Sequence, residues 1–434
     1  MPSCIDSTFI WDWASRRVQG DRMQGTDSDE ERRFETVCRF VVKLGTMVHG
    51  YGPQAQRLES YLSRITRALG YTGVFHSTPT SLAFAFKRSD ELWHRIHLVS
   101  MPGTGYNLAK LAAVGELVTA VEKGKVDVTE ATDSLAEIDA MPPPYNNCMV
   151  ALGYSLCGAG FAGFLRGSWW DIALSAILSI VVFSIVTLTR NVMERVAQWV
   201  PFLCAFVAGA LAAAFNSLLP GIQAYLITLS AIIYLIPGFS ISMGVIELTS
   251  KHVLSGITNL TNGLICLILL FAGAWTGITL TGLLLPVINT ADIAISTWLV
   301  WPFVIMLAAG LCLVFQTPRQ DLLSALAGCA VAYMGILLGE RILGSNLGNF
   351  LGTASSLVFA NIWSGRTNRP TSIVLLPAVV FMVSGSIGFR GLVALSAGDT
   401  ALGWQEFMHM FVVATTIAIG LVVGNSISKP RITL

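Results

Sequence analysis

The chain mixes hydrophobic and polar positions in its first third and becomes almost continuously hydrophobic afterwards. Between residues 34 and 140, apolar residues recur every three or four positions or alternate with polar ones, which predicts amphipathic helices and half-buried strands. The predicted helices cover 34–49, 58–69, 107–121 and 127–138, and the predicted strands cover 73–77, 81–87 and 95–99. Residues 34–141, called the head below, are therefore expected to form a small α+β domain after a disordered segment at 1–33.

Long apolar runs follow a proline-rich linker at 141–144. A helix crosses the hydrocarbon core of a bilayer with about 20 apolar residues. By that measure the rest of the chain, called the body below, contains ten predicted spans, at 148–166, 169–189, 197–218, 222–246, 257–286, 297–316, 321–340, 343–364, 371–392 and 404–426. The expected fold class is a polytopic α-helical membrane protein with an N-terminal α+β cytoplasmic domain. Its two five-helix halves comprise residues 148–286 and 297–426.

Composition agrees with a membrane protein. Charged residues make up 12% of the chain, whereas soluble proteins carry about 25%. Of the 53 charged residues, 34 lie within 1–147, so the body is nearly uncharged. A net charge of +1 provides no basic surface for nucleic acid. The eight cysteines contain no CxxC pair and lie mostly in apolar runs, which favours core packing over metal or disulfide use, and we expect no metal or other cofactor.

The distribution of positive charge favours one orientation of the spans. With the head in the cytoplasm, the inner loops and tail carry eight Lys or Arg residues and the outer loops or span ends carry three, in keeping with the positive-inside rule. The first thirty-five residues also lack the apolar core of a secretory signal. We therefore expect both termini in the cytoplasm. The inner set is Arg190, Arg195, Lys251, Arg319, Arg366, Arg369, Lys429 and Arg431, and the outer set is Arg166, Arg341 and Arg390.

A faint internal repeat connects the two halves. Leu235-Ile236-Pro237-Gly238 lies in the fourth span and Leu375-Leu376-Pro377-Ala378 lies in the ninth. Because these segments are five spans apart, two related halves would insert in opposite orientations, as in many secondary transporters. An accidental coincidence of two prolines is the alternative, since membrane helices tolerate proline.

Motifs along the chain resemble, in their order, the threonine/serine exporter family. In the head they are Gly50-Tyr51-Gly52, Gln56-Arg57-Leu58-Glu59, Leu69-Gly70, Ser77-Thr78-Pro79-Thr80, and a stretch from Asn107-Leu108-Ala109-Lys110-Leu111 through Gly124 and Glu130-Ala131 to Leu135. In the body they are Ile236-Pro237-Gly238 with the downstream Glu247, and Pro377 with the region 385–390. The resemblance covers nearly all of the chain after residue 34. It implies a fused two-half exporter with an N-terminal soluble domain, threonine/serine-like substrates, and a bacterial plasma membrane.

The fourth span holds the main candidate site. A Pro237-Gly238 break frees backbone groups that can bind a polar substrate, and Ser240 and Ser242 add hydroxyl groups. Glu247 follows in the same span, where an ionisable group is costly and is by default a functional candidate. It would bind a substrate ammonium group or carry a proton. The alternative is an interfacial Glu247 paired with Lys251 four positions later.

Further candidates lie in later spans. Pro377 and Arg390 are the counterparts in the second half, where Arg390 would bind a carboxylate through two hydrogen bonds or instead extend to the outer interface. Asn259 and Asn262 would line a polar path, although hydrogen bonds between helices are their commoner use.

The function expected is therefore a secondary transporter, not an enzyme, that exports small polar amino acids and is driven by an ion gradient. Its partners are the amino-acid substrate and the lipid bilayer, with a homo-oligomer left open. The alternatives are a membrane-anchored hydrolase or a solute sensor with its activity in the head. Ten spans are far more than an anchor requires, which argues against the hydrolase.

Overall fold

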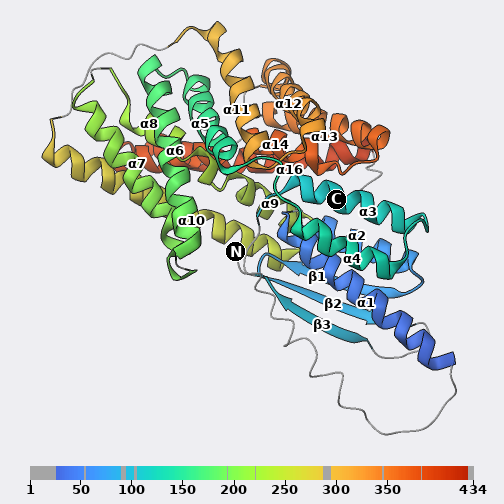
Figure 1. Cartoon of the computed structure of the whole chain (residues 1–434). Coiled ribbons are helices and arrows are strands. Elements are labelled where there is room, and N and C mark those ends of the chain that lie inside the picture. The colour runs from blue at the N-terminus through green and yellow to red at the C-terminus, as the bar shows by residue number, and fades with distance from the viewer. Residues whose placement is uncertain are drawn as a thin grey trace.

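The computed structural model describes residues 26–52, 55–88, 94–101, 105–192, 194–219, 221–286, 295–344, 347–382 and 384–428. In Figure 1 the head lies against one end of a helical body. The head contains α1 (Thr26–Gly50), α2 (Ala55–Ala68), β1 (Thr72–Thr78), β2 (Ser81–Lys87), β3 (Arg95–Ser100), α3 (Leu108–Glu122) and α4 (Val128–Ala140).

The head forms because its helices and sheet share one apolar core. The strands make an antiparallel sheet in the order β1-β2-β3. On β2 the alternate residues Leu82, Phe84 and Phe86 are buried, and α1 and α2 pack on that sheet. Asn107 caps α3 and Asp127 caps α4 through their side-chain oxygens, as such residues do at helix starts. The predicted strands and helices of the head are confirmed to within a few residues, except that α1 begins at Thr26 instead of residue 34. Residues 1–25 of the expected disordered segment lie outside the described residues.

The body consists of helices only, within the residues that the structure describes. They are α5 (Asn147–Phe164), α6 (Trp169–Val192), α7 (Val200–Asn216), α8 (Ala224–Ala231), α9 (Gly238–Thr249), α10 (Val253–Leu284), α11 (Val300–Val314), α12 (Leu322–Leu343), α13 (Gly348–Thr367), α14 (Ser372–Phe381), α15 (Ser384–Ser396) and α16 (Thr400–Ile427). Short 3₁₀ turns lie at Glu194–Trp199, Ile233–Leu235, Thr297–Leu299 and Arg319–Asp321. Seven of the described helices are long and apolar enough to cross a membrane, and a bent pair at 224–249 raises this number to eight. The chain is therefore a polytopic membrane protein.

The head is hydrogen-bonded to the body at the start of α3. The amide groups of Leu108 and Ala109 donate to the carbonyl groups of Phe315 and Gln316, each at 3.0 Å. These carbonyls lie in the connection between α11 and α12, and they satisfy amide groups that the first turn of a helix leaves free. The ring of Tyr106 packs edge-on against Phe315 at 5.2 Å. The connection after α11 therefore lies on the head side of the body.

Polar side-chain pairs attach the head at two further connections. Glu116 on α3 contacts Arg369 at 2.8 Å, in the connection between α13 and α14. Glu59 on α2 lies 3.5 Å from His252, in the connection between α9 and α10. The three connections that contact the head follow the fourth, sixth and eighth of the expected spans. In an alternating ten-span topology, connections after an even number of spans lie on the same side of the membrane as the head.

The helices of the two halves pack in matching pairs. In the first half α7 packs along α10 and α9 packs along α10; in the second half α13 packs along α16 and α15 packs along α16. Glycines at the close contacts recur with a spacing of 147 positions. The pairs are Gly238 and Gly385, Gly244 and Gly391, Gly256 and Gly403, Gly273 and Gly420, and Gly277 and Gly424.

The first helix of each half runs in the opposite direction to its counterpart. Along α5, Gly153 lies against Leu313, Gly160 against Leu307 and Gly163 against Phe303 of α11. Because the α11 numbers fall as the α5 numbers rise, the two helices are antiparallel.

The sequence-based alignment of Pro237 with Pro377 is wrong. Pro377 lies inside α14, which continues to Phe381, and the contact with Gly238 is made by Gly385 near the start of α15. Gly238 therefore corresponds to Gly385, not to Ala378. A proline removes one helical hydrogen bond but does not by itself end a membrane helix. The break at Gly238 instead coincides with the close approach of two backbones, described next.

Single cysteines in a cysteine-free background test the orientation of the body. Thr367 and Ser396 are both exposed, at the head-side end of α13 and at the far end of α15. We expect Thr367→Cys to react with a membrane-impermeant maleimide only from the cytoplasm, and Ser396→Cys only from outside. Labelling of both variants from the same side would contradict the topology.

Candidate functional site

A bent helix pair of the first half meets α15 of the second half in the middle of the body, at a pair of glycines. Helix α8 and the segment Ile233–Thr249 are bent by 58° relative to each other, and Pro237 stands at the start of α9. A methyl group added at Gly238 would lie 2.9 Å from the amide nitrogen of Gly385, and one added at Gly385 would lie 2.8 Å from that of Gly238. Only glycine allows this approach. The contact joins equivalent positions of the two halves.

Serine hydroxyls surround this crossing. Ser384 Oγ donates to the carbonyl oxygen of Gly238 at 3.2 Å and lies 3.2 Å from Ser242 Oγ. Ser242 and Ser384 are each 1% exposed. Within an 18-residue window of the span 372–396, 82% of the residues are buried inside the protein. The crossing is therefore a protein-covered polar centre, which is where interrupted membrane helices are tolerated.

Glu247 forms a second polar cluster between α9 and α10. Its side chain is 3% exposed. Its Oε2 accepts hydrogen bonds from Ser255 Oγ at 2.9 Å and from Asn259 Nδ2 at 2.7 Å. These short side chains reach Glu247 because the two helices nearly touch: a methyl group on Gly244 would lie 2.9 Å from the carbonyl oxygen of Gly256. Glu247 is thus a buried group with polar partners, as a proton carrier or ammonium ligand requires.

The remaining predicted site residues lie elsewhere. Arg390 is exposed on α15 and contacts Glu406 at 3.3 Å. α9 runs from the crossing toward the head and α15 runs away from it, so Arg390 lies on the opposite side of the crossing from Glu247. Asn262 is exposed on α10, and Ser240 is partly buried beside Gly263. Pro377 is buried within α14.

Sequence reasoning did not name Ser384, Gly385 or Ser255 as site residues, although Gly385 lies in the region 385–390 that carries the resemblance. The glycine spacing of 147 positions is a signal that could have found the first two, because it aligns Gly385 with Gly238. The same spacing aligns Asn259 with Glu406. Equivalent positions therefore belong to a buried cluster in the first half and to a partly exposed ion pair in the second.

The chemistry available at the crossing is binding, through hydroxyl and backbone groups, with a buried carboxylate further along α9. Among the described residues, no group of three or more His, Cys, Asp or Glu side chains is placed to hold a metal ion. The expectation that no cofactor is used stays a prediction.

Family models of known proteins match both halves of the chain. Residues 39–281 match the model described as a putative threonine/serine exporter. Residues 301–427 match a second model, described as a threonine/serine exporter, ThrE. No solved structure matches the chain.

Similar proteins occur in fungi and bacteria. Pheromone-regulated membrane protein 10 of Eremothecium gossypii is 23% identical over 411 residues, covering 89% of this chain and 52% of that protein. An uncharacterized protein of Schizosaccharomyces pombe is 24% identical over 392 residues, covering 86% and 46%. The probable threonine/serine exporter of Mycobacterium tuberculosis is 20% identical over 336 residues, covering 74% and 63%. The chain spans about half the length of the first of these relatives.

Substitution of either central glycine tests the crossing. We expect Gly238→Ala and Gly385→Ala each to lower the melting temperature of the detergent-purified protein, because overpacking a tight contact costs about 1–3 kcal/mol. Gly50→Ala is the control, since a methyl group there meets nothing within 4 Å. Equal melting temperatures for all three variants would show that the two backbones do not touch.

Proposed function

The chain belongs to the threonine/serine exporter family, and we propose that it exports small polar amino acids of the threonine/serine type from the cytoplasm. We further propose that an ion gradient drives this transport. The observation that carries the proposal is the crossing of the bent helix pair with α15 at Gly238 and Gly385, lined by Ser242 and Ser384. Broken helices at the centre of a repeat are the arrangement by which many secondary transporters bind polar substrates.

The proposed site comprises Pro237, Gly238 and Ser242 with Glu247 and Asn259, together with Ser384 and Gly385. Free backbone groups and hydroxyls at the crossing bind the carboxylate and hydroxyl groups of the substrate. Glu247 binds the ammonium group or exchanges a proton with the driving gradient. Roles for Ser240, Asn262, Pro377 and Arg390 in substrate binding stay sequence predictions.

We propose ten spans in two inverted halves, at 148–286 and 297–426, with both termini in the cytoplasm and the head as a separate domain. The antiparallel packing of α5 and α11 supports the inversion. The eight long or bent spans, the shorter α11 and the weakly hydrophobic α13 together account for ten. The bacterial plasma membrane stays a prediction, since the relatives include fungal and mycobacterial proteins.

The head is proposed to regulate or gate transport instead of catalysing a reaction. A hydrolase or a sensor in the head is the alternative, and no observation favours it. Contacts of the head with connections in both halves, at His252 and at Phe315, support a gating role.

Counterflow in proteoliposomes tests the substrate class. Vesicles loaded with unlabelled L-threonine or L-serine should accumulate the labelled amino acid, whereas vesicles loaded with L-leucine or L-lysine should not. If none of these amino acids gives counterflow, the proposed function is wrong.

Glu247→Gln tests the role of the buried carboxylate. The amide oxygen of Gln can still accept from Ser255 and Asn259, so the variant should insert and fold normally, but it cannot carry a proton. We expect a lower export rate and a flatter dependence of that rate on pH, measured in proteoliposomes with an imposed pH gradient.

Arg390→Gln is the matched control, because Arg390 is about half exposed, at 47%, and pairs with Glu406 outside the Glu247 cluster. It should keep the wild-type rate and pH profile. If Glu247→Gln inserts normally and also keeps the wild-type export rate and pH profile, the carboxylate has no part in transport.

A further inference from the structure

A pocket lies between the head and the body. It is small and partly open to solvent, with a cavity volume of about 20 Å³, which admits a water-sized or carboxylate-sized group. The head contributes residues from the end of α1, from α2 and from α3, and the body contributes residues from α9 and α14. The residues that line it are Tyr51, Gly52, Arg57, Leu108, Leu111, Phe239, Ser372, Leu375, Leu376 and Val379.

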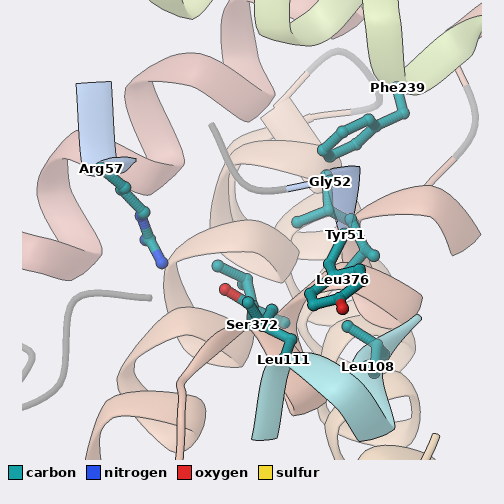
Figure 2. Close-up of a pocket in the computed structure, with 10 residues that line it drawn as sticks. Tyr51, Gly52, Arg57, Leu108, Leu111, Phe239, Ser372 and Leu376 are labelled. Carbon is teal, nitrogen blue, oxygen red and sulfur yellow. The ribbon is translucent and has the colours of Figure 1, made fainter. Parts of the chain in front are cut away.

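Arg57 is the one charged residue among the described residues that line this pocket. In Figure 2 its guanidinium points from α2 into the space beside Ser372 and Leu111. Burial lowers the pKa of Arg57 to about 10, so the group stays charged at neutral pH although it has lost much of its water. Within the described part of the chain, this guanidinium forms no hydrogen bond or ion pair. A desolvated cation without a partner is unfavourable, and an anion in the pocket would compensate it.

Two further features of the pocket favour a small anion. Ser372 is the first residue of α14, and the start of a helix carries a partial positive charge. Most of the other lining residues are apolar, so the pocket provides one strong anion-binding region against a hydrophobic wall. A carboxylate fits the planar guanidinium through two parallel hydrogen bonds. A doubly charged phosphate would bring a second negative charge that no lining residue offsets.

The pocket is also next to the crossing. Phe239 lines the pocket and directly follows Gly238, whose backbone contacts Gly385. α14, which supplies Ser372 and Leu376, precedes α15, which carries Gly385. An amino acid bound in this pocket would therefore lie next to the proposed transport site, on the side that faces the head.

We propose that this pocket is the entry site of the exporter, where Arg57 and the start of α14 bind the carboxylate of the amino-acid substrate before it reaches the crossing. The proposal rests on the proposed function and adds to it a binding site built jointly by the head and the body. The head thereby takes part in substrate recognition.

Arg57→Gln in the full-length protein tests the entry site. We expect the apparent KM for L-threonine in counterflow to rise about tenfold or more, because hydrogen bonds to a charged group contribute about 1.5–3 kcal/mol. Arg57→Lys keeps the charge without the planar pair of donors and should give an intermediate KM. Arg64→Gln is the matched control on the same helix, where Arg64 is 38% exposed and pairs with Glu122 at 2.9 Å; its KM should stay within about twofold of wild type.

Competition identifies the group that Arg57 recognises. With the purified wild-type protein, L-threonine should displace labelled L-threonine far better than L-threonine amide does, and this preference should shrink in Arg57→Gln. Inorganic phosphate should not compete. Equal competition by the acid and the amide, or displacement by phosphate that depends on Arg57, would overturn the carboxylate assignment.

The failures of the two proposals are distinguishable. If the wild-type protein transports no amino acid, the proposed function is wrong. If the wild type transports L-threonine and Arg57→Gln folds, as judged by gel filtration, with an unchanged KM and unchanged binding, the entry site is wrong. If Arg57→Gln lowers the maximal rate but leaves the KM and the affinity unchanged, the entry site is also wrong, and Arg57 stabilises the head instead of binding substrate.

Discussion

A lipid bilayer offers no hydrogen-bonding partner to an interrupted helix, and this constraint shapes the centre of the body. The chain bends by 58° between α8 and the segment Ile233–Thr249, and such a break leaves backbone groups that lipid cannot satisfy. The start of α15 covers it because Gly238 and Gly385 carry no side chains and their backbones meet. The hydroxyl of Ser384 then satisfies a carbonyl oxygen across the contact, that of Gly238. A polar centre thus exists inside the membrane only because both halves contribute to it.

The same close packing positions the acidic group. Gly244 and Gly256 bring α9 against α10, and this approach lets Ser255 and Asn259 reach Glu247. In the second half the equivalent glycines bring α15 against α16, where Arg390 and Glu406 pair near the surface. A shared backbone arrangement therefore carries different chemistry on the two sides of the crossing, with a buried carboxylate toward the head and an exposed ion pair away from it.

Local patterns predicted the elements well, because periodicity reflects which face of each element is buried. The strands of the head and the apolar helices of the body follow from that signal alone. The alignment of the halves through Pro377 failed because proline marks where a hydrogen bond is missing, whereas the contact between the halves lies where two backbones must touch, at Gly385. The pocket could not be predicted, since Arg57 and Ser372 are far apart in the sequence and meet only through docking of the head. Arg57 lies in a motif that resembles the exporter family, but no local sequence pattern indicates which residues surround it in the pocket.

The attachment of the head links recognition to movement of the halves. The head holds the first half through Glu59 and His252, and the second half through α3, Phe315 and Arg369. Transport by alternating access requires the halves to move relative to each other. Such movement must either carry the head along with one half or break one set of its contacts. Because α2 carries both Arg57 and Glu59, a substrate carboxylate bound to Arg57 lies two residues from a contact that this movement would strain. Binding and movement would therefore be coupled through a single helix of the head.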